Sequence, residues 1–366
     1  MADSNNFHAD LMRIQERFRT RLTPDVARLA KISQSVARQF VPDVRELIDF
    51  GGTDAPFEEG KLNHGIYGLE RLYTDRAVIT PHFDCSAYCR YCFKKTRTLG
   101  GDGRRMTDAD VEAAARYIQN DSRINIVLIT GGDPLIDIPL LKKVLDRMST
   151  IPDVRSIRIG TRNLLFQPEA LSEEVAEFLA SYNHVDFDNL LNSRSLSVAF
   201  SLNHPDEISS NVARAVRRLA RRGIIVRGQV TLLKGVNAES ATLRQLYGVF
   251  AALGIVPYYL YHCMPVTGTA HFRTTVERGV NVLRELAHLS GVNMPIYVYV
   301  TPVGKHRIGL SQKFDYVKIN GQNYIRATSV YRASDFFEFT GKSSLPPHHY
   351  IDSEGWIVSH YLDGTD

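Results

Sequence analysis

Cysteine is scarce in this chain, with only four among 366 residues. That number is too small for the disulfide framework that supports many secreted domains. No apolar run approaches the roughly 20 positions needed to cross a bilayer. The N-terminal residues also lack the pattern of a secretory signal, so we expect a cytoplasmic protein with reduced thiols and no membrane partner.

A large excess of one charge is also absent. The 44 Lys and Arg residues nearly balance the 40 Asp and Glu residues, and the net charge is +4. Such a mild balance does not by itself indicate nucleic-acid binding. The most basic run, residues 214–222, has helical spacing opposite Val212, Val216 and Leu219. This favours a solvent-exposed helix face, with an RNA- or partner-binding face as the alternative.

The cysteines that are present are clustered. Cys85, Cys89 and Cys92 lie within a span of eight residues, and Cys263 lies far along the chain in an apolar run. Three thiolates on one loop can each hold one iron of a [4Fe–4S] cluster, which leaves the fourth iron open to a small molecule. A zinc site usually has a second pair of ligands, which Cys263 alone does not supply. We therefore predict a cluster at the three cysteines and a buried packing role for Cys263.

Strand-like and helix-like segments alternate through most of the chain. The expected strands cover residues 77–83, 124–130, 154–159, 196–202, 224–233 and 256–262. The expected helices cover roughly residues 107–120, 137–149, 168–182, 208–222, 238–252 and 274–289. This alternation predicts an α/β fold in which helical crossovers join parallel strands, as a partial (βα)6 TIM-like barrel.

Two flanking segments are expected around that barrel, which we assign to residues 71–295. Residues 1–70 have the pattern of amphipathic helices with loops, including a helical run over 25–37. Residues 296–366 begin with a further strand and continue into a segment rich in Tyr, His and Pro. We predict that this C-terminal extension closes the open side of the barrel over the site.

Two glycines follow the second expected strand. Gly131 and Gly132 allow the backbone to approach a ligand closely, and Asp133 or the carbonyls beside it can accept hydrogen bonds from an ammonium group. The chemistry of such barrels lies at the carboxyl ends of the strands, where the cysteine loop is also expected. The turn is therefore predicted to belong to the same site.

With Tyr91 just before the third cysteine, the loop resembles the radical S-adenosylmethionine (radical SAM) superfamily. The resemblance implies that the open iron binds SAM and that an electron from the cluster cleaves it. The resulting 5′-deoxyadenosyl radical removes hydrogen from a substrate, and a donor such as flavodoxin or ferredoxin supplies the electron. The residues expected to surround SAM are Tyr91, Gly131, Gly132, Asp133, Arg162 and Asn203.

Further motifs make the chain similar to the lysine 2,3-aminomutase family over roughly residues 60–310. They occupy residues 71–76, 131–135, 158–162, 202–208, 227–237 and 270–274. This resemblance implies pyridoxal 5′-phosphate (PLP), held as an imine by a lysine of a DAPGGGGK-type motif. The amino group of the substrate migrates between adjacent carbons through that imine.

The chain departs from the family at this lysine. When the chain is matched to the family motif without gaps, Arg307 stands at the position of the PLP lysine, and a guanidinium cannot form the imine. Lys305 reaches that position only if two residues are deleted from the match. The family aspartates that bind the ammonium end of substrate lysine fall on Met264 and Val300, and neither side chain pairs with a cation. We therefore predict that PLP is absent and that Arg307 contacts an anionic group of the substrate or of SAM.

Other family positions are retained. Lys94 stands where the family uses an arginine for the substrate carboxylate, which keeps the charge but loses the bidentate fork. Tyr73, Arg76 and Gln229 match positions that line the PLP site of the family, although packing at the barrel mouth explains them equally well.

Without PLP, a substrate radical has no low-energy path for amino migration. The leading prediction is therefore a radical SAM enzyme that abstracts hydrogen from a small amino acid and desaturates it. The first alternative is a PLP-dependent 2,3-aminomutase acting on lysine, arginine or glutamate. The second is a radical SAM enzyme that modifies RNA or protein, for which the basic run at 214–222 would be the docking face. Either enzyme type is compatible with a homo-oligomer.

Overall fold

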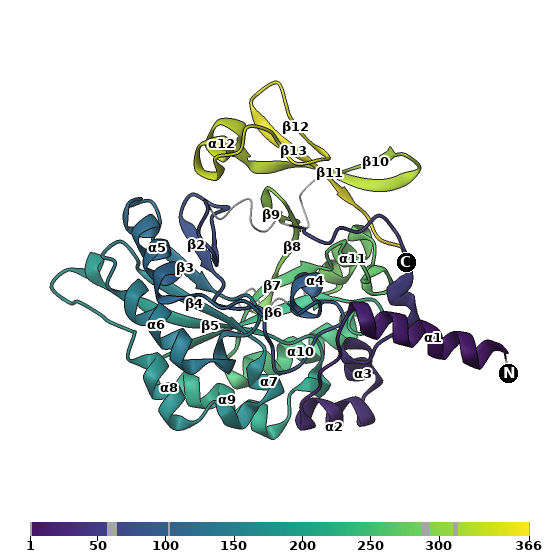
Figure 1. Cartoon of the computed structure of the whole chain (residues 1–366), viewed down its shortest axis with the longest axis horizontal. Coiled ribbons are helices and arrows are strands. Elements are labelled where there is room, and N and C mark those ends of the chain that lie inside the picture. The colour runs from purple at the N-terminus through teal and green to yellow at the C-terminus, as the bar shows by residue number, and fades with distance from the viewer. Residues whose placement is uncertain (1, 57–63, 102, 287–292, 310–313, 366) are drawn as a thin grey trace.

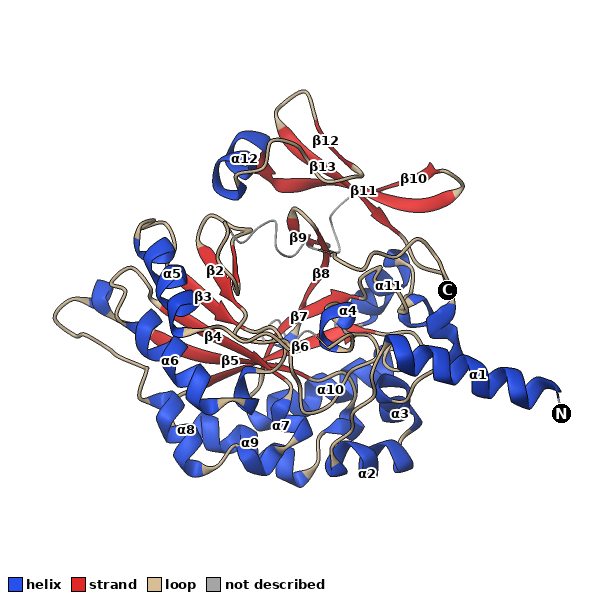
Figure 2. Cartoon of the chain, viewed as in Figure 1, coloured by secondary structure: helices blue, strands red, loops and turns tan. Residues whose placement is uncertain are grey.

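The computed structural model describes residues 2–56, 64–101, 103–286, 293–309 and 314–365. In these residues a curled sheet of nine strands forms the centre, and its strands follow one another in sequence order. Strands β2 to β8 pair in parallel, whereas β1 and β9 add antiparallel edges. Helices cover the outside of the curl, as Figures 1 and 2 show. The expected α/β partial barrel is confirmed.

The strands of the barrel sheet have these bounds: β1 Leu69–Glu70, β2 Arg76–Ile79, β3 Ile126–Ile129, β4 Ser156–Thr161, β5 Ser195–Ser201, β6 Ile225–Leu232, β7 Val256–His262, β8 Ile296–Thr301 and β9 Gly304–Arg307. The second sheet, in the order β10-β11-β13-β12, contains β10 Asp315–Ile319, β11 Gln322–Arg332, β12 His349–Ile351 and β13 Trp356–Leu362.

The α-helices are α1 Ala2–Arg17, α2 Pro24–Ile32, α3 Gln34–Phe40, α4 Lys95–Thr98, α5 Asp108–Gln119, α6 Ile138–Ser149, α7 Asn163–Phe166, α8 Glu173–Ala180, α9 Ser210–Arg221, α10 Ser240–Leu253, α11 Val276–Glu285 and α12 Ala333–Thr340. Short 3-10 helices include η1 Val44–Leu47, η2 Pro134–Ile136, η3 Pro168–Ala170, η4 Leu190–Asn192, η5 Pro205–Glu207 and η6 Ala270–Phe272.

Local sequence signals explain where these elements begin. Helix α5 starts at a capping box in which Thr107 accepts from the backbone of Asp110 and the Asp110 carboxylate accepts from Thr107. In β4, buried residues alternate with half-buried ones, so that Ile157 and Ile159 pack into the main core while Arg158 faces the interior of the barrel. One face of the strand thus packs into the core, and the side chains of the other face line the lumen.

Some boundaries differ from the sequence expectation. The helical run expected over 25–37 is interrupted at Ser33, which ends α2 and whose hydroxyl caps α3. The helix expected over 168–182 is divided into η3 and α8, because Ser172 caps a new helix. The last part of the expected helix 274–289 lies outside the described residues beyond residue 286.

The sheet also continues past the expected barrel boundary at residue 295. Strand β8 pairs in parallel with β7, and β9 returns beside it as a hairpin, so residues 296–307 complete the barrel wall. Residues that follow form the second sheet, which lies over the β8–β9 end in Figure 1. Phe336 of α12 and Ile357 of β13 pack in one buried cluster with Leu72, Tyr73 and Val303. The C-terminal extension therefore joins both edges of the open barrel.

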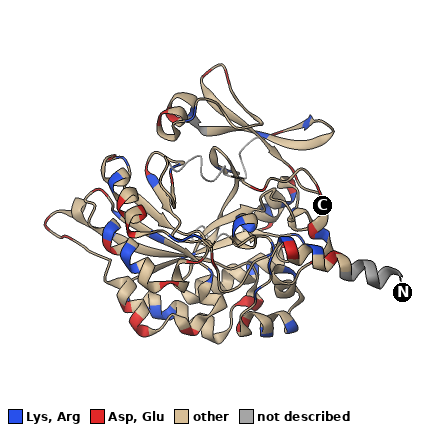
Figure 3. Ribbon diagram, viewed as in Figure 1, with Lys and Arg blue, Asp and Glu red and all other residues tan. Residues whose placement is uncertain are grey.

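The basic run on α9 lies on the outside of the barrel. Arg218 and Arg222 contact the carboxylate of Glu173 on α8, at 3.4 and 2.6 Å, while Arg214 and Arg217 are exposed. Acidic and basic residues are interspersed along the helices in Figure 3. This arrangement agrees with the predicted outer helix face, whose positive charge is partly neutralised by the acidic side chain on α8.

Candidate functional site

The cysteine loop follows β2 at the carboxyl end of the parallel strands. Cys85, Cys89 and Cys92 are half-buried, and none forms a disulfide. The N-terminal segment holds the loop through backbone hydrogen bonds, from Tyr88 N to Arg21 O before α2 and from Arg90 N to Gln39 O in α3. The loop is thus attached to the barrel at one end and to the N-terminal segment along its length.

The chemistry of these thiols fits a cluster. Burial raises the pKa of Cys92 to about 12 and that of Cys85 well above its usual value, and repulsion from neighbouring thiolates and from Asp133 adds to the effect. Three thiolates at this place therefore require a positive partner, which iron supplies. In the described part of the chain no three Cys, His, Asp or Glu residues are placed to share one metal ion. A cubane [4Fe–4S] cluster does not need such a shared site, because each of its cysteine ligands binds a different iron.

A buried ion network supports the loop, and the sequence analysis did not identify it. The Glu46 carboxylate of η1 accepts hydrogen bonds from Arg90 at 2.6 and 2.9 Å and from Lys95 Nζ at 2.6 Å. All three side chains are fully buried. Lys95 also donates to the carbonyls of Arg90 and Gly268, and burial lowers its pKa to about 8. These contacts join the N-terminal segment, the cysteine loop and the segment after β7.

The Gly131-Gly132 turn packs directly against the cysteine loop. Gly132 N donates to His82 O and Asp133 N donates to Asp84 O, both at 2.8 Å. Gly131 has φ +121°, and a Cβ on Gly132 would lie 2.0 Å from Asp84 O. The glycines are therefore required for the turn to approach the loop, which agrees with their predicted place in the site.

The Asp133 carboxylate has a different role from the one expected. It accepts hydrogen bonds from Thr161 Oγ1, from Arg162 N and from Leu135 N, at 2.7 to 3.1 Å. Burial raises its pKa to about 6. Both oxygens are thus engaged inside the protein and join η2 to the end of β4. The backbone carbonyls of the turn stay the predicted acceptors for an ammonium group.

Arg162 lies against the cysteine loop. Its Nη1 is 2.9 Å from Cys89 Sγ, and its Nη2 donates to Gln39 Oε1 at 2.8 Å and to Glu207 Oε1 at 2.9 Å. Asn203 joins this group through a 3.0 Å hydrogen bond to Gln39 Oε1. Its backbone N donates to Glu207 at 2.9 Å.

The ring of Tyr91 adds a further contact, at 5.3 Å from the Arg162 guanidinium. The structure therefore brings together Tyr91, Arg162 and Asn203, which the sequence analysis assigned to one site. Gln39 and Glu207 were missed, because a single Gln or Glu carries no sequence signal of this kind.

A second group of predicted residues meets inside the barrel. Lys305 on β9 places its Nζ 5.2 Å from the ring centre of Tyr73 and 5.7 Å from that of Tyr259. Its backbone N donates to Tyr73 Oη at 3.0 Å. Burial, together with the charges of Arg76 and Arg158, lowers the pKa of Lys305 to about 7.

The neighbours of Lys305 complete this group. The Arg76 guanidinium stacks over Tyr73 at 4.6 Å and is paired with Asp75. Gln229 of β6 is half-buried and is the register partner of Tyr259. Two of the positions that the resemblance linked to PLP, Tyr73 and Arg76, therefore lie near Lys305, and Gln229 lies beside Tyr259.

The two remaining predicted residues have different surroundings. Lys94 is buried, lies 3.3 Å from Glu70 Oε1 and faces the ring of Phe83 at 5.2 Å. Arg307 is exposed at the end of β9, opposite Val298 of β8. Lys94 therefore lies two residues from the cysteines with an acidic neighbour, whereas Arg307 lies at the rim.

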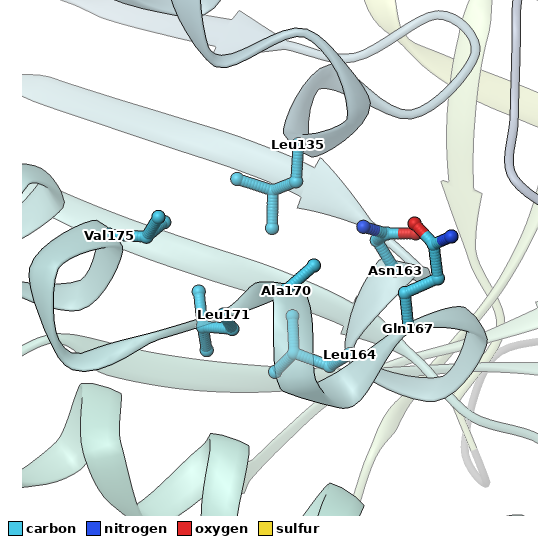
Figure 4. Close-up of a pocket in the computed structure, with 7 residues that line it drawn as sticks. All are labelled: Leu135, Asn163, Leu164, Gln167, Ala170, Leu171 and Val175. Carbon is cyan, nitrogen blue, oxygen red and sulfur yellow. The ribbon is translucent and has the colours of Figure 1, made fainter.

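A small, mostly apolar cavity lies outside this arrangement. Figure 4 shows its lining by residues of η2, α7, η3 and α8, namely Leu135, Asn163, Leu164, Gln167, Ala170, Leu171 and Val175. No cysteine and no charged side chain lines it, so we do not assign the chemistry to this cavity.

Sequence comparisons agree with the site. Residues 79–246 match the radical SAM superfamily. A putative L-lysine 2,3-aminomutase of Aquifex aeolicus (strain VF5) is 34% identical over 74% of this chain and 70% of its own length. The glutamate 2,3-aminomutase of Clostridioides difficile (strain 630) is 30% identical over 70% of this chain and 58% of its own.

Among solved structures, a radical SAM methyltransferase from Sphaerobacter thermophilus has a TM-score of 0.47 at 19% identity, over 63% of this chain and 68% of that one. No helix among the described residues is long and apolar enough to span a membrane.

The curled parallel sheet, the three-cysteine loop and the superfamily match define a radical SAM enzyme, which uses a [4Fe–4S] cluster and SAM. Within that class the chain belongs to the lysine 2,3-aminomutase family, as a divergent member.

Proposed function

We propose that the protein is a radical SAM isomerase that moves the amino group of a small amino acid between adjacent carbons, with PLP held at Lys305. The observation that carries the proposal is the setting of Lys305, between two tyrosine rings and with a pKa lowered to about 7. A lysine with this pKa is largely neutral just above pH 7, and its nitrogen lone pair is then free to react with a carbonyl. The names of the relatives point to the same reaction type.

The residues around Lys305 suit a planar, anionic cofactor. Tyr73 and Tyr259 provide aromatic faces, while Arg76 and Arg158 supply positive charge. When bound, PLP would supply the conjugated π system through which an amino group can pass between carbons. The protein's contribution would be to orient the ring, to neutralise the phosphate and to hold the Lys305 nitrogen unprotonated.

The same surroundings limit the substrate. Two family positions for cation recognition are occupied by Met264 and by the buried Val300, which is the register partner of Lys305. In the lumen Arg158 donates to Tyr258 Oη at 2.9 Å, and the Arg227 guanidinium lies 5.7 Å from the same ring. We find no carboxylate paired with Arg158, Arg227 or Lys305 among the described residues. An amino acid with an uncharged or anionic side chain therefore suits this lumen better than lysine does.

This proposal replaces the desaturation without PLP that the sequence alone favoured. That prediction depended on Arg307 in the position of the family's lysine, and Arg307 is exposed at the rim. Lys305, two residues earlier on the same face of β9, points to the tyrosines of the lumen instead. The β8–β9 hairpin thus brings a lysine to the lumen without the glycine-rich motif.

Borohydride trapping tests the proposal. Protein incubated with PLP is reduced and digested, and a pyridoxyl adduct is expected on Lys305 and to be lost in Lys305→Ala. Lys318→Ala, which removes a lysine of β10, is the matched control and should retain the adduct. Reconstituted enzyme with SAM and a reductant such as reduced flavodoxin is then given a panel of amino acids. A product of unchanged mass supports migration, whereas a loss of two mass units without any adduct would establish desaturation.

A further inference from the structure

Among the described residues, Arg162 donates a side-chain hydrogen bond to a cysteine sulfur of the cluster loop, with its Nη1 2.9 Å from Cys89 Sγ. Only 6% of it is exposed, and it lies at the end of β4, where the chain turns into α7. The contact is therefore shielded from water and set by the position of the strand end. This inference depends on the cluster and not on PLP or on amino migration.

Hydrogen bonds and charges at the sulfurs of an iron–sulfur cluster help to set its reduction potential. Reduction adds one negative charge to the cluster, and a guanidinium at a ligand sulfur stabilises that charge. Burial strengthens the effect because water does not screen it. Arg162 should therefore make the cluster easier to reduce.

Glu207 opposes this effect. Its carboxylate is fully buried and lies 2.9 Å from Arg162 Nη2, whereas Cys89 contacts Nη1. It is held in turn by Asn203 N at 2.9 Å and by Gln39 Nε2 at 2.6 Å. A buried carboxylate this close cancels part of the guanidinium's field at the cluster.

We propose that Arg162 and Glu207 act as a pair of positioning residues that set the reduction potential of the cluster, with Arg162 raising it through Cys89 and Glu207 moderating that increase. Gln39 orients the pair through hydrogen bonds from its uncharged amide to both charged groups. The pair connects α3, the cysteine loop and η5, so its geometry is defined only when the N-terminal helices are packed on the barrel.

The test measures the midpoint potential of the reconstituted cluster in the full chain, without SAM or substrate. Electron paramagnetic resonance follows the reduced cluster during titration with dithionite in the presence of redox dyes. Arg162→Gln should lower the equilibrium constant for reduction at least threefold, which is about 28 mV at 59 mV per tenfold change. Glu207→Gln should shift the potential in the opposite direction, because it leaves the positive charge uncompensated.

Two controls separate this role from general damage. Gln39→Met removes hydrogen bonds from the same buried network without changing its net charge, and should shift the potential less than either charge variant. Arg162→Lys retains the charge and should remain nearer to wild type than Arg162→Gln does. Iron content of four per chain is required for each comparison.

Shifts of the same sign in Arg162→Gln and Glu207→Gln, or an unchanged potential in Arg162→Gln, would overturn the proposal. If Glu207→Gln does not retain its cluster, the order of Arg162→Gln, Arg162→Lys and wild type decides the question. A Lys variant as low as the Gln variant would then count against a role for the charge.

Discussion

The cysteine end of the barrel and its lumen differ in whether their positively charged side chains are paired with carboxylates. At the cysteine end, Arg90, Lys95 and Arg162 each contact a buried carboxylate. In the lumen, Arg158, Arg227 and Lys305 have aromatic neighbours and no paired carboxylate among the described residues. At the cysteine end, carboxylates of the protein thus pair with all three cations, whereas the three cations of the lumen are not paired in this way within the described part of the chain.

This difference suggests different tasks. Ion pairs that are buried and fully hydrogen-bonded hold a loop in one geometry, because moving either partner leaves an unpaired charge. Cations without a carboxylate favour the entry of an anion, since the ligand then replaces the lost hydration. The buried pairs therefore fix the loop that carries the cluster ligands, and under the proposed function the unpaired cations of the lumen face the anionic groups of PLP and substrate.

The largest effect is expected at the cluster ligands. Replacing Cys85, Cys89 or Cys92 by Ala should abolish the brown chromophore and the production of 5′-deoxyadenosine from SAM, because the remaining thiolates no longer hold the cubane. Cys263→Ala is the matched control, since this buried thiol packs with Leu233, Val236 and Phe272. Iron analysis and chromatography of SAM products measure both variants. Four irons and normal SAM cleavage in Cys89→Ala would refute the ligand assignment.

The trapping of PLP at Lys305 in the lumen should depend on pH. The lowered pKa of Lys305 means that its neutral fraction grows as pH rises through about 7, whereas an ordinary lysine becomes neutral only near its usual value of 10.5. Trapping of PLP at Lys305 should therefore rise with a midpoint near pH 7. Peptide mapping at several pH values measures this, with Lys318 as internal reference. A midpoint near 10 would mean that the lumen does not depress the pKa of Lys305.

The ion network should affect stability more than an exposed pair does. Glu46→Ala leaves Arg90 and Lys95 buried without their carboxylate, and should reduce the free energy of unfolding by about 3–5 kcal/mol. Asp315→Ala breaks the exposed pair with Arg326 and should leave the unfolding curve unchanged. Urea denaturation followed by circular dichroism compares them. Equal midpoints for the two variants would show that the buried network does not hold the fold.

The smallest effect is expected at Lys94, which lies between the two regions. If it attracts the substrate carboxylate, Lys94→Ala should raise KM about tenfold with the cluster intact, as loss of one charged hydrogen bond implies. Glu70→Gln keeps Lys94 and removes only its partner, so it should not raise KM. A similar rise in both variants would assign Lys94 to the ion pair rather than to the substrate.

The sequence was most informative where chemistry depends on short spacing. The three cysteines, the two glycines after the second strand and the alternation of strands with helices predicted the cluster loop, its neighbouring turn and the α/β barrel. Each of these signals lies within one loop or one βα unit. The role of Asp133 was less predictable, because its carboxylate accepts from Thr161 and Arg162, some thirty residues further along the chain.

The sequence thus determined which chemical groups are available. They are three thiolates after a strand, the aminomutase-like motifs in their order along the chain, and a lysine two residues from the position of the family's PLP lysine. Only the tertiary structure decided which of them meet. Gln39 and Glu207 are separated by 168 residues and are joined by a 2.6 Å hydrogen bond. The hairpin of β8 and β9 likewise places Lys305 beside Tyr73, from the opposite edge of the sheet. Such contacts arise from the curl of the sheet, which brings distant strand ends into one volume, and no local pattern encodes that curvature.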